Sequence, residues 1–249
     1  MKTRRDINDY QAFYDNSPFE AEMAHFTRQH VLSEIQKFNS KRILEVGCAN
    51  LPLFTEYDSE DFDLFVTVEP SLAFAQRAEK MIEFREKTLV FNDFVENITE
   101  KLVQFDFDTI ILSGLLHEVE YPLHILEGVF KCCKADTKVH VNVPNAASFH
   151  RILAYEMGLI DSYTALSDNQ ISLQQHHTFS TKTLSELCES AGFEVLEQSS
   201  YFIKPFTHKQ MAAVTENPLF APNLLEGFSK MIKYMPDMGA HIALTLKKK

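Results

Sequence analysis

The chain has 249 residues, 45% of them hydrophobic, and its 24 basic and 35 acidic side chains give a formal net charge of -11. This length and composition fit one large α/β domain, or a domain with an added lobe. So acidic a chain lacks the broad basic face that non-specific binding to nucleic acid or anionic membranes requires, and we expect neither partner. We also expect no signal peptide and no membrane span, because no suitable apolar segment occurs.

The cysteine pattern favours a reducing compartment. The four cysteines are Cys48, Cys132, Cys133 and Cys188, and no two of them form a C-x-x-C pair. Adjacent cysteines do not have zinc-ligand spacing either. We therefore expect buried, reduced thiols in a cytoplasmic protein.

Apolar periodicity predicts the following elements in chain order. Residues 8–39 are predicted to be helical, with a break at Asn16-Ser-Pro18. Strands are predicted at 42–46, 65–69, 88–92, 107–113 and 138–143, and helices at 51–57, 71–84, 95–103 and 122–133. Nearly all-apolar strands that alternate with helices are typical of a Rossmann-like, doubly wound α/β sheet covered on both faces.

The pattern changes after Pro144. Residues 145–180 are rich in Ser, Asn, Gln and His, and a helix over 181–191 follows, with Ser180 or Thr181 as its cap and Gly192 as its end. Strands at 193–203 and 239–247 would complete a seven-stranded sheet, with 207–235 helical or irregular between them.

The most informative segment is the turn after the first strand, Glu45-Val-Gly-Cys-Ala49, together with Glu69 at the end of the second strand. Both lie at the carboxyl ends of parallel strands, which predicts a nucleotide-type pocket where the acid accepts both hydroxyls of a ribose. A dinucleotide fingerprint needs three glycines, but here the positions hold Gly47, Ala49 and Pro52. The last two obstruct the close approach of a pyrophosphate.

Two further features favour an adenosine cofactor that ends in an amino acid. Glu45 lies two residues before Gly47, where it either receives an ammonium group or supports the turn. Asn92-Asp93-Phe94 follows the third strand, where a carboxylate accepts from an adenine amino group and an aromatic ring stacks on the base.

Taken in order, these motifs resemble those of the class I S-adenosylmethionine-dependent methyltransferases, over roughly residues 40–204. The chain departs from the glycine-rich first motif at Ala49 and Leu51, where that family commonly has further glycines. The stretches that resemble the five family motifs are 43–49, 68–70 (ribose), 92–94 (adenine), 107–122 (fourth strand and its loop) and 141–145 (end of the fifth strand).

The resemblance implies S-adenosyl-L-methionine as cofactor and a single methyltransferase domain. Its parts are an N-terminal helical lid (1–40), a cofactor-binding core (41–144), a helical substrate-lid insertion after the fifth strand (145–180) and the C-terminal part of the sheet (181–249). The cofactor contacts that it implies are Glu45, Gly47, Cys48, Ala49, Glu69, Pro70, Asn92, Asp93, Phe94 and Ser113.

Candidate catalytic residues follow the fourth and fifth strands. Methyl transfer to oxygen is an in-line displacement at a sulfonium carbon, in which a base often removes the acceptor's proton. His117 and Glu118 lie just past the fourth strand, one as base and the other to orient it, and His150 is a second candidate base. The alternative is that His117 and Glu118 cap the loop or pack beside the cofactor.

Three polar clusters, 145–151, 174–177 and 204–211, are the candidate acceptor site. They loosely resemble methyltransferases of sugar and surface-polysaccharide biosynthesis, which implies a polar acceptor that is hydroxylated or phosphorylated. Cationic side chains there would bind a phosphate or carboxylate, or else belong to a hydrogen-bonded lid. The candidate substrate-binding residues are Asn145, Arg151, His176, His177, Lys204 and His208. No two histidines are four residues apart, a spacing common in metal sites, and we predict no metal site.

The N-terminal helices either fold over the cofactor, with Tyr10, Tyr14 and Arg28 towards the ligands, or simply pack on the edge of the sheet. The predicted function is O-methylation of a small polar acceptor such as a sugar or sugar nucleotide. The alternatives are a catalytically inactive, methyltransferase-like binding protein, motivated by Ala49 and Leu51, and an NAD-linked oxidoreductase that uses the same Glu69. The sequence does not specify the oligomeric state, and a homodimer is one open alternative.

Overall fold

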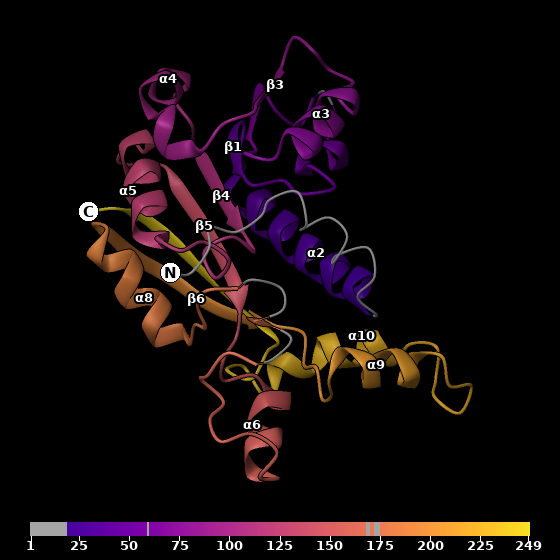
Figure 1. The fold of residues 1–249 in the computed structure, drawn as a ribbon. Coiled ribbons are helices and arrows are strands. Elements are labelled where there is room, and N and C mark those ends of the chain that lie inside the picture. Colours follow the sequence, from indigo (N-terminus) through magenta and orange to yellow (C-terminus); the bar gives the residue numbers. More distant parts are fainter. Residues whose placement is uncertain (1–18, 59, 168–169, 172–174) are drawn as a thin grey trace.

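The computed structural model describes residues 19–58, 60–167, 170–171 and 175–249, and its centre is a seven-stranded sheet in the order β3-β2-β1-β4-β5-β7-β6 (Figure 1). The strands are β1 (Arg42–Val46), β2 (Leu64–Val68), β3 (Thr88–Phe91), β4 (Thr109–Ser113), β5 (Lys138–Pro144), β6 (Phe193–Tyr201) and β7 (His241–Lys248). β7 is antiparallel to both of its neighbours, while the other pairs are parallel. The predicted seven-stranded, Rossmann-like fold is confirmed.

Helices cover both faces of the sheet. They are α2 (Glu20–Phe38), α3 (Leu72–Lys80), α4 (Thr99–Leu102), α5 (Pro122–Cys132), α6 (Phe149–Glu156), α8 (Thr181–Ser190), α9 (His208–Thr215) and α10 (Leu224–Lys230). Short 3₁₀ turns lie at Leu53–Glu56, Val95–Asn97, Val103–Phe105 and Met231–Lys233. Among the described residues, no helix combines the length and apolarity needed to span a membrane.

Two predicted helices are wrong in detail, and the helix predicted at 71–84 ends earlier, at Lys80. Residues 51–57 hold only the 3₁₀ turn Leu53–Glu56, because polar side chains of other segments bind the backbone at Leu51, Pro52 and Leu53. Residues 95–103 form separate short turns, since Ile98 has φ -114° and ψ 16°, outside the helical range. The predicted start of the first helix and its break lie outside the described residues; α2 begins at Glu20.

Alternating residues along each central strand feed two cores. On β1, Leu44 packs into a core with residues of α4, α5 and α8, while Ile43 packs on the other face with Val31 and Ile35 of α2. Both β1 residues are fully buried. A strand with both faces covered must be apolar throughout, which is why these segments read as continuous apolar runs.

Local signals set the ends of α8. Ser180 and Thr183 form a reciprocal capping box at its first turn. Gly192 follows the helix with φ 95°, a left-handed conformation that glycine adopts without strain. A Cβ at this position would also lie 2.9 Å from the ring of Phe130. The cap at Ser180 and the stop at Gly192 are thus as predicted.

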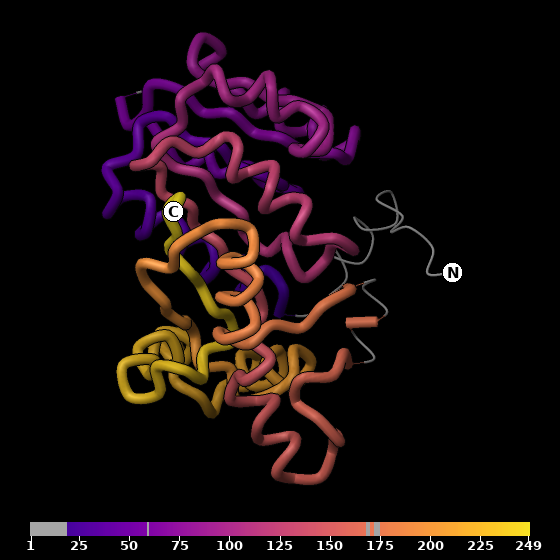
Figure 2. Tube along the Cα trace, turned by 90° about the vertical axis from the view of Figure 1, so that its left-hand side faces the viewer, coloured from indigo at the N-terminus to yellow at the C-terminus, as the bar shows by residue number. Residues whose placement is uncertain are grey.

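Helices α6, α9 and α10 gather at one end of the sheet, beyond the carboxyl end of β5 (Figures 1 and 2). α6 belongs to the segment after β5, whereas α9 and α10 connect β6 to β7. Since β5 and β6 both run antiparallel to β7, they end at the same edge as β1 and β2. The helices at the ligand-binding edge therefore come from two separate segments, one after β5 and one between β6 and β7. The predicted lid insertion is only the first of these segments.

Candidate active site

A cavity of about 1710 Å³ runs along the carboxyl edge of the sheet. It is lined at one end by residues that follow β1 and β2, and at the other by residues of α2, α6, β7 and the segment after β6. The predicted site residues that line it are Glu45, Gly47, Cys48, Ala49, Glu69, Pro70, Phe94, Ser113, His117, Glu118, Asn145, His150, Arg151, His176, Lys204 and His208. Asn92, Asp93 and His177 are outside this lining.

Glu69, just past β2, is buried and held by three backbone N–H groups. Cys48 and Ala49 donate to its Oε2 at 3.0 and 3.2 Å, and Ser71 donates to its Oε1 at 2.9 Å. Burial raises the pKa of this carboxyl, and the backbone donors oppose the rise. The two carboxylate oxygens are thus fixed at the cavity wall by the turn itself.

The turn after β1 keeps its left-handed shape without the second glycine. Gly47 has φ 78° and Ala49 has φ 47°. A left-handed alanine costs about 1 kcal/mol relative to its ordinary conformation. The departure from the glycine-rich motif at Ala49 therefore carries a cost in strain while the turn is retained.

Glu45 supports this turn from below, which is one of the two roles considered for it. The backbone N–H of Leu53 lies 3.1 Å from each carboxylate oxygen, and the Thr67 hydroxyl donates to Oε2 at 3.3 Å. Burial raises the pKa of Glu45 to about 8, against the lowering effect of these donors and of Arg28. The carboxyl is therefore largely protonated at neutral pH.

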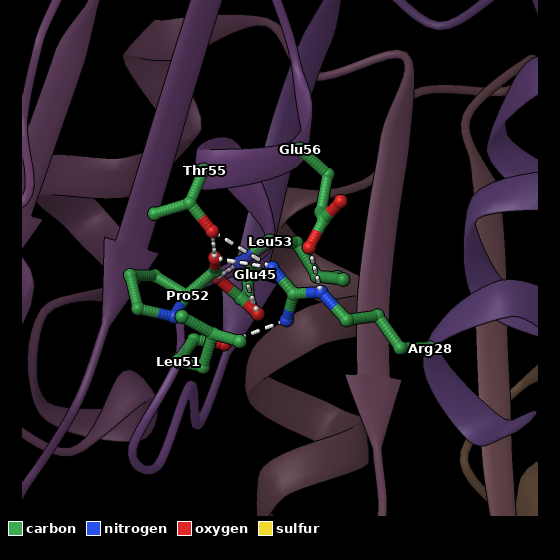
Figure 3. A network of polar contacts seen from close by, with 7 residues as sticks. All are labelled: Arg28, Glu45, Leu51, Pro52, Leu53, Thr55 and Glu56. Carbon is green, nitrogen blue, oxygen red and sulfur yellow. Dashed lines mark hydrogen bonds and ion pairs between the residues drawn. The ribbon is translucent and has the colours of Figure 1, made fainter. Parts of the chain in front are cut away.

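Arg28 of α2 clamps the same loop (Figure 3). Its guanidinium donates to the carbonyls of Leu51 and Pro52 at 2.8 Å each. It also reaches the Thr55 hydroxyl at 2.9 Å and a carboxylate oxygen of Glu56 at 2.8 Å. Contact of Arg28 with the ligands was one of the two alternatives from the sequence, and in the structure its guanidinium binds the protein's own turn. Tyr10 and Tyr14 lie outside the described residues.

Of the three residues in the motif after β3, Asn92, Asp93 and Phe94, only Phe94 lines the cavity. Asn92 donates from its amide to the carbonyls of Glu69 and Pro70 at 2.9 and 3.0 Å, which fixes the loop after β2. Asp93 accepts from the Phe94 N–H at 2.8 Å and from the Asn97 amide at 2.9 Å. Of the three, only the Phe94 side chain lies in the cavity wall.

The loop after β4 forms the middle of the cavity. His117 and Glu118 are both buried, with His117 Nε2 3.7 Å from Glu118 Oε1. The backbone N–H groups of His176 and His177 donate to the His117 carbonyl at 2.9 and 3.1 Å. The His177 ring turns away towards the Glu120 carbonyl, 3.2 Å distant. The segment around His176 is thus fastened across the loop that carries the candidate base.

Asn142 of β5 was missed by sequence analysis as a site residue. It lines the cavity and exchanges hydrogen bonds with the Ser113 hydroxyl, with an Nδ2–Oγ distance of 3.0 Å. Its Oδ1 accepts from the Gly114 N–H at 3.2 Å. The available signal was a polar residue near the carboxyl end of the fifth strand, at the edge where ligands bind.

Ionisable side chains dominate the far end. Lys204 is 7% exposed, and burial lowers its pKa to about 8, although Glu20 acts in the opposite direction. His208 Nδ1 lies 3.8 Å from Glu20 Oε2, and burial, with Lys204, lowers the pKa of His208 to about 3. Burial also lowers the pKa of His150 well below its ordinary value. Both imidazoles are neutral at neutral pH.

Two other residues predicted to bind the acceptor have side chains that hydrogen-bond to other parts of the protein. Arg151 donates to the Tyr163 carbonyl at 2.7 Å and to Gln170 Oε1 at 2.9 Å. Asn145 donates to the carbonyls of Asp237 and Gly239 at 3.1 and 2.9 Å, and so joins the end of β5 to the start of β7. Within the described ranges, no group of three or more His, Cys, Asp and Glu is placed to hold a metal ion.

Comparison with known proteins agrees with this geometry. The sequence profile described as "Methyltransferase domain" matches residues 19–198, and the chain belongs to that family. A search of curated protein sequences finds no significant match.

Solved structures of S-adenosylmethionine-dependent methyltransferases share the fold. One from Thermotoga maritima, with histamine N-methylation as its suggested activity, is 18% identical, with a TM-score of 0.56 over 97% of this chain and 99% of its own. One from Archaeoglobus fulgidus is 14% identical, with a TM-score of 0.55 over 89% and 94%. The plantazolicin methyltransferase, solved with a desmethyl-plantazolicin analogue and S-adenosylhomocysteine, is 14% identical, with a TM-score of 0.55 over 96% and 94%.

The protein is a class I S-adenosylmethionine-dependent methyltransferase, and S-adenosylmethionine is its cofactor. The residues present suit that group. An aromatic ring at Phe94, a buried carboxylate at Glu69 and a tight backbone turn with Glu45 beneath it follow β3, β2 and β1 in turn along the cavity.

Proposed function

We propose that the protein methylates an oxygen of a small polar acceptor, such as a sugar or sugar nucleotide. The observation that carries the proposal is the continuity of one cavity from Glu69 to Lys204. Its first end suits the adenosine, and its second is large and lined with hydrogen-bonding groups. An acceptor bound there meets the methyl donor in the middle of the cavity, beside the loop after β4.

The cofactor supplies an electrophilic methyl group on a sulfonium. The protein's own residues hold the cofactor and align its methyl group with the acceptor. We assign the ribose hydroxyls to Glu69, the adenine face to Phe94 and the amino-acid end to the turn from Gly47 to Ala49 above Glu45. Asn92 and Asp93 act indirectly, by setting the backbone that presents Glu69 and Phe94.

His117 is the stronger candidate for the base. Its imidazole lies in the cavity wall near the end of β4, with the Glu118 carboxylate nearby to stabilise the charge gained on protonation. The pKa of His150 is lowered by burial and by Lys204, which makes this imidazole a weak base. We therefore give His150 a role in acceptor binding.

The cofactor part of the proposal is tested by calorimetry with S-adenosylhomocysteine. Native protein should bind it, and Glu69→Ala should lose most of the affinity. Glu127→Ala, on the exposed side of α5, is the matched control. Full binding by Glu69→Ala would contradict the ribose assignment, and stronger stabilisation by NAD than by S-adenosylmethionine would revive the oxidoreductase alternative.

The acceptor part is tested by release of S-adenosylhomocysteine with a panel of hydroxylated and amine acceptors. Turnover of hydroxylated compounds is the expected result. His117→Asn should lower kcat at least about 100-fold, whereas His150→Asn should raise the KM for the acceptor with little change in kcat. Turnover of amines alone would overturn oxygen as the acceptor atom. Binding without turnover of any acceptor would favour the inactive, methyltransferase-like alternative.

A further inference from the structure

The Lys204 ammonium is placed in the cavity wall without a close anionic partner. The residue follows β6, is 7% exposed and lines the cavity. Within the part of the chain that the structure describes, its Nζ has no hydrogen bond and no carboxylate oxygen within 4 Å. A buried cation costs free energy unless a partner compensates it.

The surrounding charges compensate Lys204 only in part. Glu20 is the opposite charge that acts on it, while Arg151 repels it. Oε2 of Glu20 itself lies 3.8 Å from Nδ1 of His208, whose imidazole is neutral. Arg151 donates to neutral oxygens of Tyr163 and Gln170, so neither cation is matched by a carboxylate in contact.

This place is remote from the cofactor's ribose. β2, which Glu69 follows directly, and β6, which leads to Lys204, are five positions apart in the strand order. At about 4.8 Å for each step, the strands are roughly 24 Å apart. The adenosine and the amino-acid end of the cofactor belong over β2 and β1, so an anion at Lys204 belongs to the acceptor.

We infer that the acceptor carries an anionic group, a carboxylate or a phosphate, and that Lys204 binds this group. The inference rests on the proposed function, because it assigns the second end of the cavity to the acceptor. Neutral His150 and His208 supply further hydrogen-bonding groups at the same place.

Small anions serve as probes. The protein is saturated with S-adenosylhomocysteine, and its thermal midpoint is followed against inorganic phosphate and, separately, acetate at constant ionic strength. We expect at least one anion to raise the midpoint of native protein in a saturable manner. The apparent Kd should be at least about tenfold weaker in Lys204→Gln, and largely restored in Lys204→Arg. Preference for phosphate or for acetate identifies the kind of group.

Lys182→Gln is the matched control, because this lysine side chain is 83% exposed and outside the cavity. Without probe anions, Lys204→Met should keep or raise the midpoint, whereas a structural ion pair with Glu20 would make it fall. Equal shifts in native protein and Lys204→Gln, or no saturable shift with either anion, would overturn the inference. Failure of S-adenosylhomocysteine itself to stabilise native protein would instead count against the proposed function.

Discussion

The two ends of the cavity are built in different ways. At the cofactor end, neighbouring backbone N–H groups of Cys48, Ala49 and Ser71 hold a single carboxylate, Glu69. At the acceptor end, side chains from α2, α6, α9 and the segment after β6 meet with few direct ion pairs among them. Satisfied backbone contacts make a rigid, general cofactor site, whereas incompletely compensated ionisable groups suit selective binding of a partner.

The largest expected effect is a loss of stability in acid, which comes from buried histidines at and beside the acceptor end. Burial lowers the pKa of His30 to about 4 and those of His140, His208 and His241 to about 3. In the unfolded chain these histidines have pKa values near 6.5, so they bind protons at pH values at which the folded protein keeps them neutral. The stability contribution is therefore complete above about pH 6.5 and declines as the pH falls towards 4, by at most about 1.4 kcal/mol per histidine and pH unit.

Urea denaturation at several pH values between 7.5 and 5 measures this decline. His241→Gln should show a shallower dependence on pH than native protein, while His25→Gln, at an exposed position of α2, should show the same one. An identical slope for native protein and His241→Gln would contradict the assignment of a buried neutral imidazole.

Removal of the Arg28 clamp should affect the cofactor end alone. Arg28→Met deletes hydrogen bonds to Leu51, Pro52 and Thr55 and leaves the loop carbonyls without their donor. We expect S-adenosylhomocysteine to bind roughly tenfold more weakly, since charged hydrogen bonds contribute about 1.5–3 kcal/mol. Calorimetry checks this, with the exposed Arg85→Met as control. Loss of anion binding at Lys204, with the cofactor affinity unchanged, would reverse the assignment.

Proton release should report contact between the cofactor's ammonium and Glu45. The raised pKa of about 8 keeps this carboxyl protonated in the free protein, and a nearby cation favours its ionised form. Binding of S-adenosylhomocysteine at pH 7 should then release up to about one proton. Calorimetry in two buffers of different ionisation enthalpy should give different heats, and the difference should shrink in Glu45→Gln but persist in Glu127→Gln.

The smallest expected effect concerns strain in the turn. Ala49→Gly removes a left-handed alanine, φ 47°, and should stabilise the protein by about 1 kcal/mol, or roughly 3 °C in Tm. Ala75→Gly, at a buried position of α3, should lower Tm instead. A lower Tm in Ala49→Gly would show that the alanine side chain makes contacts worth more than the strain.

Much of the fold was predictable because its signals are local. The apolar strands, the cap at Ser180, the stop at Gly192 and the acid after β2 depend on residues close together in the chain. Leu53–Glu56 was harder to predict, because its apolar residues have helical spacing while the contacts that limit it come from Arg28 and Glu45. Asn92 and Asp93 follow the adenine motif in sequence, but their hydrogen bonds bind the backbone of neighbouring loops.

The sequence by itself determined the sheet, the turn after β1 and the kind of cofactor, because neighbouring residues with a fixed spacing encode each of them. Only the tertiary structure decided that Arg28 closes the turn and that Lys204, Glu20 and Arg151 share one end of the cavity. These side chains come from segments up to 184 residues apart, from Glu20 to Lys204. Their proximity depends on how helices pack at the carboxyl edge, and no spacing along the chain records that packing.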